Sequence, residues 1–152
     1  MGYYNHMKIT NKRAFYDYEI LDRLEAGIQL SGSEVKAIRD GHADLSGSFV
    51  KIIGSEGYLV NAKVFPYAFA RSEGYDEQRS RKLLMHKKEL LSLKAKTASG
   101  GLTIVPISLY NTGQLIKLEI GVAKGKKQYQ KKEAKKRKDI EKDIARELDE
   151  RT

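Results

Sequence analysis

The chain has 152 residues, of which 40% are hydrophobic and 32% are charged, and its formal net charge is +9. It contains no cysteine, which excludes a disulfide framework and a thiolate metal site. No apolar run approaches the ~20 residues of a membrane span and none has the layout of a secretory signal, so we expect a soluble, cytoplasmic protein.

The composition changes along the chain and divides it into three parts. Residues 1–10 are an N-terminal extension, and we interpret those before Met7 as a remnant of cloning, because His6-Met7 is a common cloning junction. Residues 11–123 form a body that is long enough for one hydrophobic core without staples. Residues 124–152 form a basic C-terminal tail.

Strand-like residues dominate the first part of the body. Aromatic and β-branched residues predict a strand over residues 15–22, which Gly27 interrupts before it resumes. A glycine inside a strand indicates a bulge or the close approach of another backbone. Ser31 and Glu34 have the spacing of a capping box and predict a helix of two to three turns, with Gly41 as its left-handed stop.

The middle of the body predicts a hairpin and a second helix. Strands over residues 49–53 and 58–64 flank a four-residue turn, and Pro66 ends the second strand or leaves it at an edge. Residues 67–80 are typical of a long surface connection. Strong helix formers then predict a helix from Lys87 to about Ala98, which Ser99-Gly100-Gly101 terminates.

Two more strands complete the body. Residues 102–110 predict a strand that is broken or placed at an edge by Pro106, and residues 115–122 alternate with the period of a half-buried strand. Five or six strands in hairpins, with two helices inserted, favour a mainly β fold. The fold class that we predict is a small antiparallel OB-fold-like β-barrel with peripheral helices.

The tail is strongly basic. Residues 124–142 hold ten Lys or Arg and three Asp or Glu residues, so their charge is +7. Such a run is either a solvated face or an arm that binds polyanions, most often nucleic acid. Ile140, Ile144 and Leu148 lie four residues apart, but one narrow apolar stripe does not hold a helix in water. We therefore expect a tail that is disordered when free and helical on binding.

The sequence contains no complete motif for catalysis or for cofactor binding. Residues 121–127 imitate a phosphate-binding loop, but the glycines are one residue too close and Lys127 replaces the magnesium-binding Ser or Thr. The histidines His6, His42 and His86 have no metal-ligand spacing. We expect no enzyme, no cofactor, no metal and no catalytic residue.

Three residues fit a role at nucleic acid as well as an ordinary structural one. Glu25 either makes a surface charge pair or accepts hydrogen bonds from nucleobase amines. His86 either packs at a helix start or contacts RNA. Tyr129, the one aromatic residue of the tail, is either solvent-exposed or stacks on a base.

Six short motifs, in this order and spacing, resemble the bacterial SsrA-binding protein (SmpB) family from about Asn11 to Lys132. They are Asn11-Lys12-Arg13-Ala14, Glu25-Ala26-Gly27, Gly32-Ser33-Glu34-Val35-Lys36, Arg81-Lys82-Leu83-Leu84-Met85-His86-Lys87-Lys88-Glu89, Ser108-Leu109-Tyr110 and Ala123-Lys124-Gly125-Lys126-Lys127. The family often has Asp-Lys-Arg where this chain has Gln130-Lys131-Lys132. This chain therefore lacks an acidic residue and the planar guanidinium of an arginine at these positions.

The resemblance implies a barrel that binds the tRNA-like domain of transfer-messenger RNA (SsrA RNA) and replaces its missing anticodon arm on a stalled ribosome. The tail then enters the decoding centre and the empty mRNA channel, and trans-translation begins. Elongation factor Tu and alanyl-tRNA synthetase are expected as partners through the shared RNA, and no membrane is expected. The RNA-binding residues that it implies are Asn11, Lys12, Arg13, Glu25, Gly27, Arg81, Lys82, Leu84, His86, Lys124, Gly125, Lys126 and Lys127. The ribosome-binding residues of the tail are Tyr129, Lys131, Lys132, Lys135, Lys136, Arg137 and Lys138.

Three other functions compete with this one. A generic basic RNA-binding or ribosome-associated OB-fold module would show no preference for transfer-messenger RNA. A magnesium-dependent nuclease would need paired carboxylates, and the acidic residues show no such spacing. A membrane-surface protein would need a wider apolar face and aromatic anchors in the tail.

Overall fold

The structure is a computed structural model that describes residues 6–67 and 73–150. The predictions for residues 1–5, for residues 68–72 of the surface connection and for residues 151–152 of the tail therefore lie outside it. The strands are β1 (Lys8–Thr10), β2 (Tyr18–Ile28), β3 (Ala43–Asp44), β4 (Phe49–Ile53), β5 (Glu56–Val60), β6 (Lys63–Val64), β7 (Arg81–Leu84), β8 (Leu102–Thr112) and β9 (Leu115–Gly125). The helices are α1 (Lys12–Asp17), α2 (Gly32–Arg39), α3 (Lys87–Ala98) and α4 (Gln128–Glu150).

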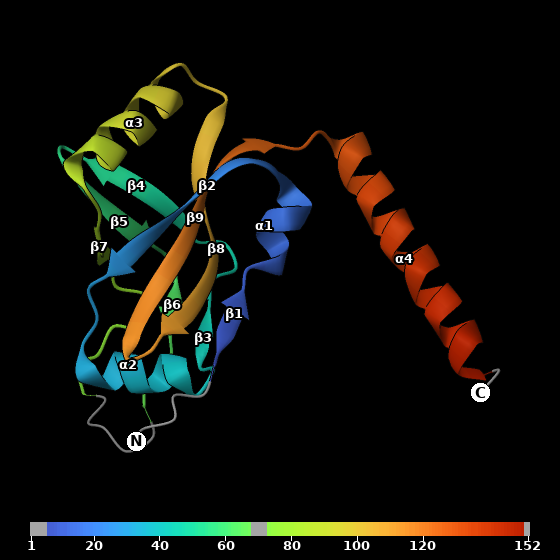
Figure 1. The fold of residues 1–152 in the computed structure, drawn as a ribbon, viewed down its shortest axis with the longest axis horizontal. Helices are drawn as coiled ribbons and strands as arrows, with labels where there is room; N and C mark the ends of the chain where they lie inside the picture. The colour runs from blue at the N-terminus through green and yellow to red at the C-terminus, as the bar shows by residue number, and fades with distance from the viewer. Residues whose placement is uncertain (1–5, 68–72, 151–152) are drawn as a thin grey trace.

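Seven strands form one antiparallel sheet in the order β1-β8-β9-β2-β7-β5-β4. The last strand of this order, β4, also packs against β8, so the sheet curls into a small barrel with helices around it (Figure 1). Leu59, Leu109, Leu118 and Ile120 are almost fully buried inside. The mainly β fold with an antiparallel barrel and peripheral helices is therefore confirmed.

The two inserted helices begin and end as the sequence predicts. The Ser31 hydroxyl accepts from the amide of Glu34 at 3.2 Å, and the Glu34 carboxylate accepts from the amide of Ser31 at 3.0 Å. This capping box begins α2, and Gly41 follows its end with a φ of +80°. α3 is followed by Gly100 and Gly101, both in the left-handed region.

The prediction of a strand from residue 15 is wrong for its first three residues. They belong to α1, and the strand β2 begins only at Tyr18. Asn11 caps this helix by accepting from the amide of Ala14 at 3.3 Å. Ala14 packs with Val105 and Ala123 in a small second cluster outside the barrel core. Tertiary burial of one helix face thus overrides the strand propensity of the aromatic residues.

Gly27 does not interrupt β2, which continues to Ile28. A Cβ at Gly27 would lie 3.0 Å from the Cβ of Leu84 on β7. Of the two predicted roles, a bulge or a close approach of another strand, Gly27 therefore has the second. The irregularity in β2 lies elsewhere, between Ile20 and Asp22, where the pairing with β9 shifts.

The first hairpin is tighter than predicted. Ile53 pairs with Glu56, so the turn contains only Gly54 and Ser55, and β5 ends at Val60. Gly57 lies inside β5 because Leu90 of α3 packs over it; a Cβ there would be 3.2 Å from Leu90 Cδ2.

Pro106 does not break β8, which runs from Leu102 to Thr112. The pairing with β9 shifts between Pro106 and Ser108, and this irregularity accommodates the missing amide donor. On the other side, the Asn11 side-chain amide donates to the Pro106 carbonyl at 2.9 Å. The proline is therefore built into the strand through a bulge.

Both ends of the barrel extend beyond the predicted body of residues 11–123. Lys8–Thr10 is a strand that pairs with β8, and β9 carries Lys124 and Gly125, which pair with Glu19 and Tyr18. The tail is helical as α4 and projects from the body (Figure 1). The loss of this helix in the free protein stays a prediction. None of the helices in the described residues is long and apolar enough to cross a membrane.

Candidate nucleic-acid interface

Four of the predicted RNA-binding residues meet in one groove of about 470 Å³. Glu25 and Gly27 come from β2, Leu84 from the end of β7, and His86 from the residue that precedes α3. The groove is also lined by Met85, Glu89 and Lys117. Residues that are about 60 positions apart in the chain are thus brought together because β2 pairs with β7.

The floor and the rim of the groove differ in chemistry. Leu84 is 56% exposed, so an aliphatic side chain lies open to solvent above the backbone of Gly27. The amide of His86 donates to the Glu89 carboxylate at 3.0 Å, which leaves the exposed imidazole at the rim. An apolar floor with polar groups around it suits an unpaired nucleobase, which has both a flat face and a hydrogen-bonding edge.

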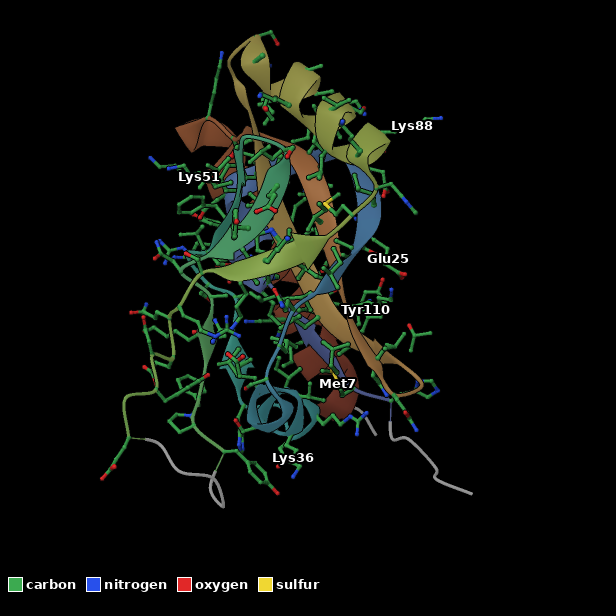
Figure 2. All side chains as sticks on the ribbon, turned by 90° about the vertical axis from the view of Figure 1, so that its left-hand side faces the viewer. Met7, Glu25, Lys36, Lys51, Lys88 and Tyr110 are labelled. Atoms are coloured by element: carbon green, nitrogen blue, oxygen red, sulfur yellow. The ribbon has the colours of Figure 1, made fainter. Side chains whose placement is uncertain are left out.

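Glu25 is held in place by Tyr110, which stands in one of the six motifs but was not predicted to bind RNA. The Tyr110 hydroxyl donates a hydrogen bond to the Glu25 carboxylate. Burial raises the pKa of Tyr110, and the hydrogen bond to Glu25 raises it further, so the phenol keeps its proton. Glu25, Tyr110 and Met7 follow one another down one side of the body in Figure 2.

The strand register extends this face across four strands. Lys8, Tyr110, Lys117 and Gly27 form one row over β1, β8, β9 and β2. Thr10, Ser108, Glu119 and Glu25 form the adjacent row. These are the outward positions, since the residues between them on the strands, such as Leu109 and Leu118, belong to the core.

Arg81 corrects the prediction, because it is fully buried and cannot contact RNA. Its Nε donates to Glu34 at 2.7 Å, and its other nitrogens donate to the carbonyls of Ala62, Arg79 and Glu77 and to the Tyr75 hydroxyl. All the donors of the guanidinium are therefore satisfied within the fold, where they tie β7 to α2 and to the preceding loop.

Asn11 is a second correction. Its side chain is 4% exposed, and both of its polar atoms are used: one caps α1 and the other donates to Pro106. The basic part of its motif remains accessible, since Lys12 and Arg13 are exposed on α1. Lys82 is half-buried on β7 and pairs with Glu56 at 3.0 Å.

A second group of predicted residues gathers where the tail leaves the body. Lys126 is anchored there: its ammonium donates to the Phe15 carbonyl at 2.8 Å and its amide donates to the Asp17 carbonyl at 2.9 Å. Asp17 also contacts Arg13 at 3.3 Å and Lys131 at 3.4 Å. The predicted residues Lys124, Gly125 and Lys127 are exposed here. One acidic residue thus organises a cationic surface around α1 and the start of α4.

The remaining tail residues are displayed along α4. The predicted tail cations Lys132, Lys135, Lys136, Arg137 and Lys138 are exposed on this helix. Tyr129 belongs to the helix, but its side chain lies outside the described residues.

The residues of this face that the sequence analysis did not predict to bind RNA are Tyr110, Lys117, Glu119 and Met85, although Tyr110 and Met85 stand in two of the six motifs. The signal for the first three was present in the hairpin formed by β8 and β9, which turns at Gly113 with a φ of +61°. Once that turn is placed, Tyr110 falls opposite Lys117 and Ser108 opposite Glu119. Their proximity to Glu25 required the pairing of β9 with β2, which no local pattern indicates.

In the described residues, no group of three His, Asp or Glu side chains could hold a metal ion. The groove provides the Glu25 carboxylate as an acceptor and the Leu84 side chain for aliphatic contact. The surface around α1 and the start of α4 provides cations. The groove with Glu25 has the means to recognise a base, and the surface around α1 and α4 has the means to neutralise phosphates.

Comparisons with known proteins agree on one family. A sequence model of the family described as SmpB protein matches residues 8–150. The chain is 50% identical over 135 residues to the SsrA-binding protein of Sulfurihydrogenibium sp. (strain YO3AOP1), covering 89% of each chain. It is 47% identical over 143 residues to the SsrA-binding protein of Geobacter sulfurreducens, covering 94% of each.

A solved structure is also similar. It is described as "tmRNA-SmpB: a journey to the center of the bacterial ribosome", and it matches with a TM-score of 0.68 and 44% identity over 80% of this chain and 85% of that chain. These matches agree with the barrel fold and with the six sequence motifs. The chain belongs to the SmpB protein family.

Proposed function

We propose that this protein binds the tRNA-like domain of transfer-messenger RNA and delivers it to stalled ribosomes for trans-translation. The observation that carries the proposal is the groove in which Glu25, Gly27, Leu84 and His86 meet. Membership of a family whose relatives are named SsrA-binding proteins supports the identity of the RNA. The similar structure, in which tmRNA and SmpB are described with the bacterial ribosome, supports the site of action.

The two regions divide the work between them. The groove and the adjoining sheet face recognise the folded RNA by shape and by unpaired bases, and the barrel occupies the place of the anticodon arm that this RNA lacks. The cations of α4 lead the tail into the decoding centre and the empty mRNA channel. Elongation factor Tu and alanyl-tRNA synthetase engage the same complex through the RNA.

The function is tested by binding and tagging together. In a mobility-shift assay, the protein should bind the tRNA-like domain more tightly than an ordinary tRNA. Ending the chain after Lys126 keeps the anchor on Phe15 and Asp17, so RNA binding should remain while tagging on stalled ribosomes is lost. Equal affinity for both RNAs would identify a generic RNA-binding module instead, and equal loss of binding and tagging would contradict the division of work.

Glu25→Ala tests the groove itself. Removing a negative charge from a protein of net charge +9 should strengthen unspecific RNA binding, so weaker binding by this variant would show specific recognition. The matched control is Glu73→Ala, which makes the same charge change at an exposed position away from the groove. We expect Glu25→Ala to bind the tRNA-like domain several-fold more weakly and to unfold at the same temperature as the wild type. Unchanged affinity would remove Glu25 from the site.

A further inference from the structure

Arg23 lies on β2 between the groove and the surface from which the tail leaves the body. The strand passes the groove at Glu25 and begins at Tyr18, which pairs with Gly125 at the start of the tail. Arg23 is two residues from Glu25 on this path, about 7 Å along the strand. Leu24 packs against the core between them, so Arg23 and Glu25 share the outward face. An RNA strand that continues from the groove towards the tail passes over Arg23.

The guanidinium of Arg23 is held in place from two sides. Its Cζ lies 5.5 Å from the centroid of the Phe15 ring of α1, which is a cation–π contact. Its Nη1 donates to Glu119 Oε1 at 3.1 Å. The side chain is nevertheless 54% exposed, and the guanidinium has no other hydrogen-bond partner in the described residues. Nε and Nη2, which lie side by side, therefore remain available to an anion.

A phosphate that approaches this part of the sheet meets two carboxylates. Glu25 and Glu119 are direct cross-strand partners on β2 and β9, and like charges in this arrangement repel each other. They repel a phosphate for the same reason. Among the described residues, Arg23 is the only cation that forms an ion pair with either of them. Arg23 is therefore well placed to let an RNA backbone come close to the sheet here.

We propose that Arg23, stacked on Phe15, binds a phosphate of the RNA strand that continues from the groove towards the tail. The proposal rests on the proposed function, because the RNA is the one that lies in the groove. The adjacent N–H groups of Nε and Nη2 can donate to two oxygens of one phosphate, and the contacts with Phe15 and Glu119 fix their direction beforehand. This contact positions the RNA between the groove and the cations around α1.

Arg23→Ala and Lys96→Ala are a matched pair of variants that test the contact. Each removes one cation from an exposed ion pair and frees one carboxylate, since Lys96 lies 2.9 Å from Asp22. Both should remain folded, because exposed ion pairs contribute little to stability. Arg23→Ala should bind the tRNA-like domain about 3- to 10-fold more weakly. Its slope of log affinity against log salt should be smaller by about 1, whereas Lys96→Ala should keep the wild-type slope. Equal effects of the two variants would overturn the proposal.

Two further variants separate a phosphate contact from simple neutralisation of Glu119. Arg23→Lys keeps the charge but loses the planar pair of donors, so it should recover only part of the affinity. In a Glu119→Gln background, Arg23→Ala should still weaken binding, because the phosphate contact is lost there as well. If Arg23→Ala had no effect in that background, Arg23 would only neutralise Glu119 and the proposal would be wrong.

Ethylation interference tests the contact on the RNA side. Ethylnitrosourea ethylates phosphate oxygens and removes the negative charge at single positions of the RNA. Ethylation of one phosphate in the tRNA-like domain should weaken binding of the wild type and leave the affinity of Arg23→Ala unchanged. The same interference pattern for both proteins would contradict the contact.

These outcomes separate the two proposals. If the wild type does not prefer the tRNA-like domain to an ordinary tRNA, the proposed function fails. If it does prefer that domain, but Arg23→Ala behaves like Lys96→Ala and gives the wild-type interference pattern, only the Arg23 contact fails.

Discussion

Glu34 is a carboxylate in the first turn of α2 that lies inside the fold and accepts hydrogen bonds from Arg79, Arg81 and the amide of Ser31. Burial acts to raise its pKa, but the hydrogen bonds from Arg79, Ser31 and Arg81 outweigh burial and lower the pKa from 4.5 to about 2. Because the pKa is lower in the folded than in the unfolded state, Glu34 stabilises the fold above pH 4.5. That stability is lost as the pH falls from about 4.5 to about 2.

Glu34→Gln should therefore flatten the acid side of the stability profile. A lowering from 4.5 to about 2 corresponds to about 3 kcal/mol of pH-dependent stability for a group that is shielded from solvent. Urea unfolding between pH 6 and pH 2.5 would measure this for both proteins. The other carboxylates contribute equally to the wild type and to Glu34→Gln. If the free energy of unfolding fell equally with pH in both proteins, Glu34 would not be the source of the loss of stability in acid.

Tyr110 acts at the interface through Glu25. Tyr110→Phe removes only the hydroxyl that donates to Glu25, so the carboxylate gains rotational freedom and RNA affinity should fall about 3- to 10-fold. A double-mutant cycle with Glu25→Ala isolates this effect, because Tyr110→Phe should change nothing further once Glu25 is absent. Additive losses in affinity would mean that Tyr110 contacts the RNA independently of Glu25.

Among the elements, α1 is the one whose conformation the local sequence misrepresents. It covers the outer face of the sheet. On this face Gly121 of β9 has no side chain, and neighbouring atoms occupy the space that a Cβ would need. A Cβ at Gly121 would lie 2.8 Å from Ile107 Cδ1, 3.0 Å from Ile20 Cγ2 and 3.3 Å from the Asp22 carbonyl oxygen. The layer of side chains on this face thus depends on a glycine in the middle of a strand.

Gly121→Ala should destabilise the protein by about 1–3 kcal/mol, the usual cost of overpacking a filled space. Gly125→Ala is the matched control on the same strand, since a Cβ there has no atom within 4 Å. Thermal unfolding of the two variants should separate them clearly, with the control at or above the wild type. Equal melting temperatures would show that Ile107 and Ile20 move aside without cost.

The described side chains of the helix α4 show few contacts with the body. Among the described residues, the helix contacts the body near its start, where Lys131 lies 3.4 Å from Asp17, and further along Ile140 and Ile144 are about half exposed. A peptide of residues 124–152 should therefore show little helix by circular dichroism when alone and gain helix when RNA is added. Full helicity of the peptide alone would contradict this.

At the scale of the whole molecule, the positive charge is spread over the barrel and the tail, so affinity for RNA should depend strongly on salt. If about six phosphates are neutralised, the logarithm of the affinity should fall against the logarithm of the salt concentration with a slope of roughly −4 to −5. Titration of the tRNA-like domain at several salt concentrations gives this slope. A flat response would exclude an electrostatic contribution of that size.

Local patterns were sufficient wherever a structure is stabilised by neighbours in the chain. The capping box of Ser31 and Glu34 predicted α2, and the paired glycines after residue 99 predicted the end of α3. Alternation of Ile116, Leu118 and Ile120 predicted β9 and its buried face. The resemblance to the SmpB family, and not a local pattern, implied RNA-binding roles for Glu25, Leu84 and His86, which the fold brings into one groove.

Local patterns failed where distant contacts decide. The residue types around Phe15 predicted a strand. The segment is a helix because Ala14 is buried against Val105 and Ala123, which are distant in the sequence. Arg81 looked like a surface cation because it stands in a basic run, but Glu34, 47 positions away, accepts its hydrogen bond inside the core.

The sequence by itself therefore determined the fold class, the basic character of the tail and the family to which the chain belongs, because each depends on order, periodicity and composition along the chain. Only the tertiary structure decided which charges are buried and which residue holds Glu25 in place. Burial and hydrogen bonding between residues far apart in the chain depend on the register of strands that only folding brings side by side.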